Sequence, residues 1–202
     1  MNTCYLVGAG ENDYVPSPDP SDLVIAADGG YDFLISHGVR CDLLIGDLDS
    51  IKDVPTNLEI IKHKVEKDET DMHLSYLVGK ERGYRDFIIL GGMGGRADHT
   101  FANYSLLLYI AADGCRAKML SRDLLATVIK NSEISLCGRQ GATFSVFAIG
   151  GKAEGVSVLR AKYEAHSVSL LPDFPLGVSN SFLDSPVSVS VEHGALLIIQ
   201  EL

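Results

Sequence analysis

The sequence predicts an α/β protein with two domains, a parallel-sheet domain over residues 1–121 followed by a small antiparallel β-sandwich over residues 122–202. Up to about Met119, short apolar runs alternate with longer amphipathic segments, as expected for helices that cross between parallel strands. After about Leu120, short β-branched and aromatic runs are separated by glycines, a pattern typical of antiparallel strands. The 202 residues, of which 46% are hydrophobic, are enough to form packed cores.

The first domain is expected to contain buried strands connected by helices. The strands are the apolar runs Leu23–Ala27, Leu43–Ile45 and Phe87–Leu90. The helices are expected at Tyr31–His37, Asp71–Arg82 and Asp98–Asp113. In the second of these helices, Leu74, Leu77 and Val78 recur at helical spacing and are expected to face the sheet. Prolines at positions 16, 18 and 20 make the segment Glu11–Ser21 a loop.

The second domain is expected to consist of short antiparallel strands. They are predicted at Ala126–Lys130, Thr143–Ile149, Val156–Leu159, Val168–Leu171, Val187–Val191 and Leu196–Ile199. Turns are expected at Gly150-Gly151, Pro172-Asp173 and His193-Gly194, and this spacing of strands and turns suits a β-sandwich.

Charge and composition exclude several classes of protein. The formal charge of −10 disfavours a nucleic-acid partner, because such proteins gather Lys and Arg against phosphates. No apolar stretch approaches the ~20 residues that a membrane span needs, and the start Met1–Cys4 lacks the basic residues of a secretory signal, so the expected location is the cytoplasm. Cysteines 4, 41, 115 and 137 form no Cys-x-x-Cys pair and are expected to be reduced thiols rather than zinc ligands or disulfides.

Acidic residues follow two of the predicted strands. Asp28 comes directly after Leu23–Ala27, and Asp47 and Asp49 come directly after Leu43–Ile45. If the extended backbone persists past the strand, its period of two sends Asp47 and Asp49 to the same side, close enough to share a cation. Because the carboxyl ends of parallel strands form a ligand crevice, these acids are expected to converge. A single Asp before glycine is also an ordinary turn, but the repeated pattern favours a metal or phosphate site.

Two further segments of the first domain carry charged residues at predicted helix starts. The segment Lys67-Asp68-Glu69-Thr70-Asp71 opens a helix, and capping explains one or two of its residues but leaves Lys67 and the excess of acid unexplained. The segment Gly91–His99 holds four glycines between a strand and a helix. Its backbone amides can approach an anion closely, and Arg96 can bind phosphate oxygens, so this loop is expected to hold phosphate. It matches neither the dinucleotide-binding nor the Walker pattern.

The segment Gly177–Phe182 of the second domain places small polar side chains beside an aromatic one. Ser179 and Asn180 form a common turn pair, but they are also able to hydrogen-bond a heteroaromatic ring while Phe182 packs nearby. Both interpretations of this segment stay open.

These motifs, in this order, resemble the thiamine pyrophosphokinase family, whose members transfer pyrophosphate from ATP to the hydroxyl of thiamine, giving thiamine diphosphate and AMP. The resemblance covers nearly the whole chain. The matching segments are Ala27–Gly30, Gly46–Ser50, Lys67–Asp71, Gly91–His99 with Ala102-Asn103, and Gly177–Asn180. The resemblance implies a Rossmann-like catalytic domain over 1–121, a thiamine-binding β-sandwich over 122–202, and a homodimer with active sites at its interface.

The resemblance also implies roles for individual residues. Asp47, Asp49 and Asp71 are implied as catalytic acids and Mg²⁺ ligands, with Asp28 beside them. The ATP-binding positions that it implies are Asp28, Gly29, Lys67, Gly92, Gly94, Gly95, Arg96 and Asp98. The thiamine-binding positions that it implies are Thr70, Asp71, Ser179 and Asn180.

Two alternatives to thiamine pyrophosphorylation stay open at this point. One keeps the chemistry but uses a pterin alcohol as the acceptor, since the catalytic half is distantly similar to such enzymes. The other is a non-catalytic protein that binds nucleotide or thiamine, against which the intact acids argue. The segment Lys162-Tyr163-Glu164-Ala165 departs from the family, which usually has a proline after the aromatic residue, and this departure bears on the acceptor.

Overall fold

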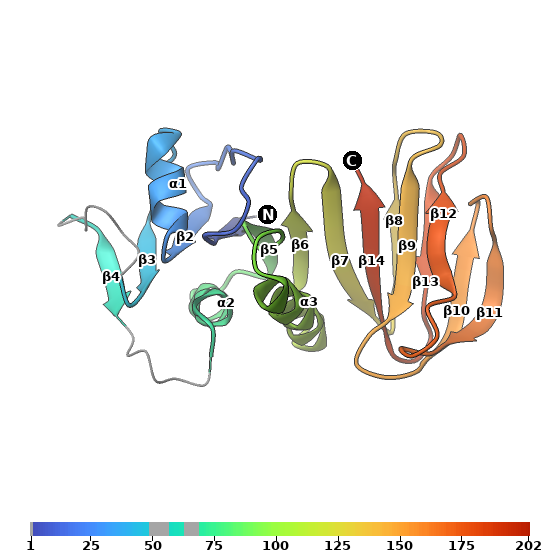
Figure 1. The fold of residues 1–202 in the computed structure, drawn as a ribbon. Coiled ribbons are helices and arrows are strands. Elements are labelled where there is room, and N and C mark those ends of the chain that lie inside the picture. The colour runs from blue at the N-terminus through green and yellow to red at the C-terminus, as the bar shows by residue number, and fades with distance from the viewer. Residues whose placement is uncertain (1, 49–56, 63–68) are drawn as a thin grey trace. The chain divides into compact units, whose positions relative to one another are not determined.

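A computed structural model describes residues 2–48, 57–62 and 69–202 of the chain (Figure 1). The chain divides into two compact units, each described by itself below. Unit 1 comprises Met1–Leu106 with Gly114–Arg122, and unit 2 comprises Leu107–Asp113 with Asp123–Leu202. The division into domains at residues 121 and 122 stays a prediction.

Unit 1 contains parallel strands connected by helices. The strands are β1 (Thr3–Val7), β2 (Leu23–Ala27), β3 (Leu43–Gly46), β4 (Glu59–Lys62), β5 (Asp86–Leu90) and β6 (Arg116–Leu120). The helices are α1 (Gly30–Ser36), α2 (Asp71–Glu81) and α3 (Ala97–Ala112), of which the part from Leu107 onward is grouped with unit 2. The strand order is β6-β5-β1-β2-β3-β4, and each adjacent pair is parallel. The predicted strands and helices are therefore present, within one or two residues at most ends.

Strands β2 and β3 consist of buried residues throughout, as expected where both faces of a parallel sheet are covered. The core beside them includes Val24, Leu34, Leu44 and Leu90. Continuous apolar runs are the sequence signal of such strands, which explains why β2 and β3 could be predicted. Strand β4, with two exposed and two half-buried residues, lacked that signal.

The prediction for the buried face of α2 was wrong. Its buried residues are Met72, Ser75, Tyr76 and Gly79, whereas Leu74, Leu77 and Val78 are only half-buried. A Cβ atom at Gly79 would lie 2.8 Å from Cys4 Sγ, so the glycine lets the helix backbone approach β1 closely. The small residues of this face allow close packing, and they escape a search for hydrophobic periodicity.

Unit 2 contains two antiparallel sheets. Their strands are β7 (Leu124–Lys130), β8 (Glu133–Leu136), β9 (Thr143–Ala148), β10 (Ala153–Leu159), β11 (Ala165–Leu170), β12 (Gly177–Ser181), β13 (Val187–Ser190) and β14 (Ala195–Glu201). One sheet has the order β12-β9-β14-β7 and the other β11-β10-β13-β8. Both contribute to one core, which includes Phe144 and Val146 from β9 and Val187 and Val189 from β13. This arrangement agrees with the predicted antiparallel part of the chain, while β8 and β12 were not predicted.

The side chain of Asn180 ties β12 to the connection between β10 and β11. Its Oδ1 accepts hydrogen bonds from the backbone N–H groups of Tyr163 (3.0 Å) and Ser181 (2.9 Å), and its Nδ2 donates to the carbonyl of Tyr163 (2.7 Å). Asn180 is 9% exposed, so these backbone groups would lack protein partners without it. The structure therefore gives Asn180 a part in holding the backbone of unit 2.

The four cysteines are free thiols, as predicted. Burial raises the pKa of Cys4 and raises the pKa of Cys41 to about 11, so both thiols are protonated at neutral pH and weakly reactive. Among the described residues, none of the helices combines the length and the apolar character that crossing a membrane requires.

Replacing Asn180 with alanine should lower the free energy of unfolding of unit 2 by about 1–3 kcal/mol, because part-buried backbone groups of Tyr163 lose their partner. Urea unfolding followed by circular dichroism measures this loss. Ser179→Ala is the matched control, since the exposed Ser179 side chain is expected to contribute less than about 0.5 kcal/mol. Equal stability of Asn180→Ala and the parent chain would contradict the structural role.

Candidate functional site

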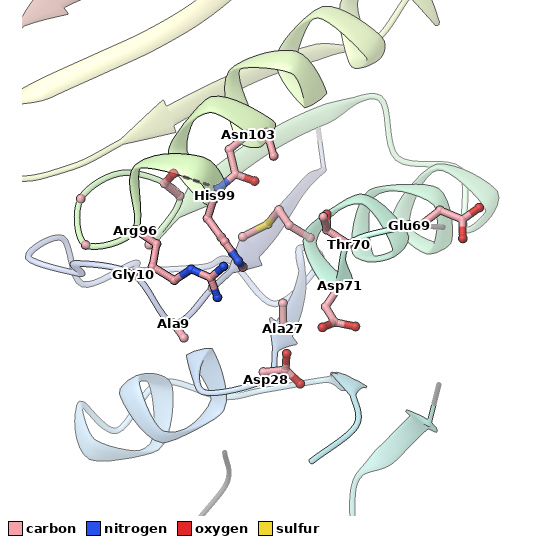
Figure 2. A pocket seen from close by; sticks show the side chains of 17 residues that line it. Ala9, Gly10, Ala27, Asp28, Glu69, Thr70, Asp71, Arg96, His99 and Asn103 are labelled. Carbon is pink, nitrogen blue, oxygen red and sulfur yellow. Dashed lines mark hydrogen bonds between the residues drawn. The ribbon is translucent and has the colours of Figure 1, made fainter. Parts of the chain in front are cut away.

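A cavity of about 480 Å³ lies in unit 1, at the carboxyl ends of β1, β2 and β5 and at the starts of α2 and α3 (Figure 2). It is lined by segments that follow these strands or open these helices: Gly8–Gly10, Ala27-Asp28, Glu69–Met72, Gly91-Gly92, Gly94–Arg96, His99 and Ala102-Asn103. The crevice expected at the strand ends is therefore present.

Strand pairing brings these segments together. Val7 of β1 is in register with Ala26 of β2 on one side and with Leu90 of β5 on the other. The backbone contact between β1 and β5 continues past the strands, where the N–H of Gly8 donates to the carbonyl of Leu90 (2.8 Å) and that of Gly10 to Gly91 (3.1 Å). The loops after β1 and β5 are thus held against each other at the edge of the cavity.

Asp28 is held at the end of β2 in an unusual backbone conformation. Its φ of 46° lies in the left-handed region, and its N–H donates to the carbonyl of Ile45 on β3 (2.9 Å). A Cβ atom at Gly46 would overlap Asp28 Oδ1, so the glycine makes room for this carboxylate. A side chain held against strain in this way is typical of a functional position.

Asp71 enters the cavity from the first turn of α2. Thr70 caps the helix, since its hydroxyl accepts a hydrogen bond from the N–H of His73 (3.2 Å). In Figure 2, the carboxylates of Asp28 and Asp71 point toward the same space, and Arg96 extends toward it from the glycine-rich loop. Negative and positive side chains therefore face each other across the cavity.

The glycine-rich loop between β5 and α3 is fixed at its base, and Gly94 and Gly95 at its tip are exposed residues. Asn103, which is buried, donates from Nδ2 to the carbonyl of Gly92 (2.9 Å; Figure 2). Gly94 and Gly95 adopt φ values of 80° and 64°, which residues other than glycine rarely adopt. Backbone amides in such a loop are suited to binding an anion, and the N–H of Gly95 already donates to the carboxylate of Glu11.

Arg96 and Asp98 form an ion pair on this loop. Nε and Nη2 of Arg96 donate to the two oxygens of Asp98 at 3.2 and 2.6 Å. Hydrogen bonding by Arg96 lowers the pKa of Asp98 to about 2, so this carboxylate is ionised at neutral pH. The Arg96 side chain is 72% exposed, so a stronger anion can compete for it.

Seven of the predicted site residues line the cavity. Those that line the cavity are Asp28, Thr70, Asp71, Gly92, Gly94, Gly95 and Arg96. Gly29, Asp47 and Asp98 are described but are not part of the lining. Lys67 and Asp49 lie outside the described residues, and Ser179 and Asn180 belong to unit 2.

The expected geometry of Asp47 and Asp49 rested on an extended backbone, and that premise was wrong at Leu48. Leu48 has a φ of 69° and is buried in the core, while Asp47 is exposed. The left-handed turn at Leu48 breaks the period of two on which the prediction depended. Within residues 2–48, 57–62 and 69–202, no three acidic, histidine or cysteine side chains are grouped to hold a metal ion. Carboxylate oxygens are nevertheless the donors that Mg²⁺ prefers, so the acids present fit this ion chemically.

The sequence interpretation missed the segment Gly8-Ala9-Gly10, which lines the cavity after β1. The sequence pattern that would have identified this segment is the one used at the other strands, because Gly8 and Gly10 come just after the apolar run Tyr5–Val7. Met72 was also missed, because an apolar residue on a helix carries no sign of a site.

Several known proteins resemble this chain. The family model described as the catalytic domain of thiamin pyrophosphokinase matches residues 18–119. The thiamine pyrophosphokinase of Bacillus subtilis (strain 168) is 22% identical over 211 residues, which cover 99% of each sequence. A crystal structure of thiamine pyrophosphokinase from Bacillus subtilis superposes with a TM-score of 0.90 at 22% identity, covering 99% of both chains. The structure of thiamin pyrophosphokinase from Candida albicans superposes with a TM-score of 0.78 at 14% identity. The superposition covers 100% of this chain and 89% of the Candida albicans chain.

The structural likenesses show that the chain has the fold of these proteins. The match of the family model goes further, because it covers half of the chain and contains every part of the cavity that follows β2 and β5. Apart from Gly8–Gly10, all the residues that line the cavity lie in this recognised catalytic domain, and the chain belongs to the thiamin pyrophosphokinase family.

Proposed function

We propose that this protein transfers pyrophosphate from ATP to the hydroxyl of thiamine, giving thiamine diphosphate and AMP. The observation that carries this proposal is a single cavity in which Asp28 and Asp71 face Arg96 and the glycine-rich loop. Membership in the family favours thiamine over a pterin alcohol as the acceptor. The retained carboxylates argue against a protein that only binds its ligands.

The glycine-rich loop and Arg96 bind and orient the phosphate chain in this proposal. Backbone amides of the loop donate to phosphate oxygens, and the guanidinium group of Arg96 binds them in a fork. Lys67 and Asp98 are proposed to contact the same phosphate chain of ATP. Asp28 and Gly29 are proposed to lie beside the nucleotide. Fixing the phosphates in this way exposes the β-phosphorus to in-line attack.

The reaction breaks the bond between the β-phosphorus and the oxygen that bridges it to the α-phosphorus. The hydroxyl oxygen of thiamine forms the new bond to the β-phosphorus, and AMP leaves with the bridging oxygen. The hydroxyl proton passes to a carboxylate, for which we propose Asp71 because it opens α2 directly at the cavity. Thr70, at the same helix start, is proposed to lie against the thiamine.

A bound Mg²⁺ would neutralise the phosphate oxygens that repel the attacking hydroxyl. Asp47, Asp49 and Asp71, with Asp28 beside them, are the residues proposed to hold it. This choice rests first on the oxygen donors that Mg²⁺ prefers. It also rests on position, because Asp28 follows β2, Asp47 follows β3 and Asp71 begins α2.

We also propose that residues 1–121 form a Rossmann-like catalytic domain and residues 122–202 a thiamine-binding β-sandwich. The parallel strand pairs of unit 1 and the two antiparallel sheets of unit 2 support this assignment. Ser179 and Asn180 are the proposed thiamine contacts of the second domain, in a homodimer whose active sites lie at the interface. The free thiols suit a reducing compartment, which supports the cytoplasm as its location.

Incubation with ATP, Mg²⁺ and thiamine should yield AMP and thiamine diphosphate in equal amounts. Phosphorus NMR separates these products from ADP and thiamine monophosphate. ADP as the product would reject attack at the β-phosphorus, and a pterin alcohol used in preference to thiamine would reject the acceptor.

Asp71→Asn should lower kcat by at least about a hundredfold, because the amide cannot accept the hydroxyl proton. The same change weakens a favourable charge at the start of α2, so the expected loss of stability is only about 0.3–1 kcal/mol. Steady-state kinetics with thermal melting measures both effects. Glu81→Gln, at the exposed end of the same helix, is the matched control and should keep the parent kcat. A kcat near the parent value in Asp71→Asn would exclude this residue as the base.

Ser179→Ala should raise the KM for thiamine about tenfold, which corresponds to about 1.4 kcal/mol and is the usual cost of one lost hydrogen bond to a ligand. The KM for ATP should stay within about twofold of the parent value, since ATP binds through unit 1 in this proposal. An unchanged KM for thiamine would show that Ser179 is only part of the strand.

A further inference from the structure

The side chain of Glu11 lies against the tip of the glycine-rich loop. Its Oε1 accepts a hydrogen bond from the N–H of Gly95 (3.3 Å). A Cβ atom at Gly94 would lie 2.6 Å from both Cδ and Oε2 of Glu11, so the carboxylate packs directly on the two glycines. The chain therefore supplies its own anion to a loop whose amides are suited to a phosphate oxygen.

The backbone around Glu11 holds the side chain in this position. The N–H of Gly10 donates to the carbonyl of Gly91 (3.1 Å), and Nδ2 of Asn12 donates to the carbonyl of Gly8 (2.7 Å). A Cβ atom at Gly10 would overlap the carbonyl of Gly91, so the two loops are as close as their backbones allow. The contact of Glu11 thus follows from the register of two anchored loops.

The other anion-binding group of the loop is engaged in the same way. Arg96 donates to both oxygens of Asp98, as described above. Asp28, Glu69 and Asp71 add negative charge to the lining of the cavity. An incoming phosphate chain must consequently displace carboxylates from the N–H of Gly95 and from Arg96, within surroundings that are already acidic.

We propose that Glu11 is an internal competitor of the phosphate chain, which occupies the N–H of Gly95 until a polyphosphate replaces it. This inference rests on the proposed function of the cavity. An anion that makes few contacts elsewhere, such as inorganic phosphate or a nucleoside monophosphate, gains too little to displace the carboxylate. A triphosphate that also binds Arg96 has enough further contacts to bind despite this cost. Glu11 therefore lowers the affinity of every anion that takes this N–H by a similar factor, which leaves short phosphates and the monophosphate product weakly bound.

The test is the affinity of the full chain for inorganic pyrophosphate, for AMP and for ATP, measured by isothermal titration calorimetry. Glu11→Gln removes the charge while keeping the length of the side chain, and its Kd for pyrophosphate and for AMP should fall about fivefold to tenfold. The Kd for ATP should fall by a similar factor, since ATP must displace the same carboxylate. Asp13→Asn is the matched control, because Asp13 is an exposed acid two residues further along the same loop. Its Kd values should stay within twofold of those of the parent chain.

Unchanged or weaker binding of pyrophosphate and AMP by Glu11→Gln, in a variant that melts like the parent chain, would overturn the inference. An equal gain in Glu11→Gln and Asp13→Asn would also overturn it, since general charge would then explain the effect. Glu11→Asp keeps the charge but shortens the side chain. A Kd for pyrophosphate close to that of Glu11→Gln would support the direct contact between Glu11 and the N–H of Gly95. If the parent chain makes thiamine diphosphate while Glu11→Gln binds as the parent does, only this inference fails. If the parent chain binds neither ATP nor pyrophosphate, the proposed function fails as well.

Discussion

The pairing of β1 with both β2 and β5 is the constraint on which the site depends. Because the three strands are parallel and in register at Val7, their ends lie in one line, and the loops that follow them cover one cavity. Hydrogen bonds from Gly8 and Gly10 to the end of β5 continue this register into the loops. The catalytic geometry is therefore set by backbone contacts within the sheet rather than by contacts among the polar side chains themselves.

Electrostatics at this cavity work against an anionic substrate unless other groups compensate. The chain carries a formal charge of −10, and acids contribute to the lining on the side of β2 and α2. Arg96 and the backbone amides of the glycine-rich loop oppose them from the side of α3. Such a division suits a reaction in which a carboxylate must be basic while phosphate oxygens are neutralised a few bonds away. It also explains why the loop is made of glycine, since amides supply positive potential without adding bulk.

Much of the fold and part of the site could be predicted from the sequence. Strands β2 and β5 are apolar runs that end at polar or glycine residues, and this local signal identifies both the strand and its functional end. The rule for parallel sheets predicted that Asp28, Asp47 and Asp49 converge with the glycines after β5. Asp28 and these glycines line the cavity, Asp47 does not, and Asp49 lies outside the described residues. The buried face of α2 and the turn at Leu48 could not be read in this way, because close packing of Gly79 and a left-handed backbone are decided by tertiary contacts. Asn180 illustrates a different difficulty, since its type suits a ligand contact and a backbone brace equally well.

The close approach of Gly46 to Asp28 has a consequence for how this sequence tolerates change. Any larger residue at position 46 would occupy the space of the Asp28 carboxylate, which belongs to a neighbouring strand. Substitution there would displace the Asp28 carboxylate, which lines the cavity, without replacing any charged residue. Positions that are sensitive to substitution thus include residues without a reactive side chain. A survey restricted to acidic and basic residues would miss them. The effect of such variants would combine volume with backbone strain, because Gly46 has a φ of 152° and one methyl group already overlaps the Asp28 carboxylate.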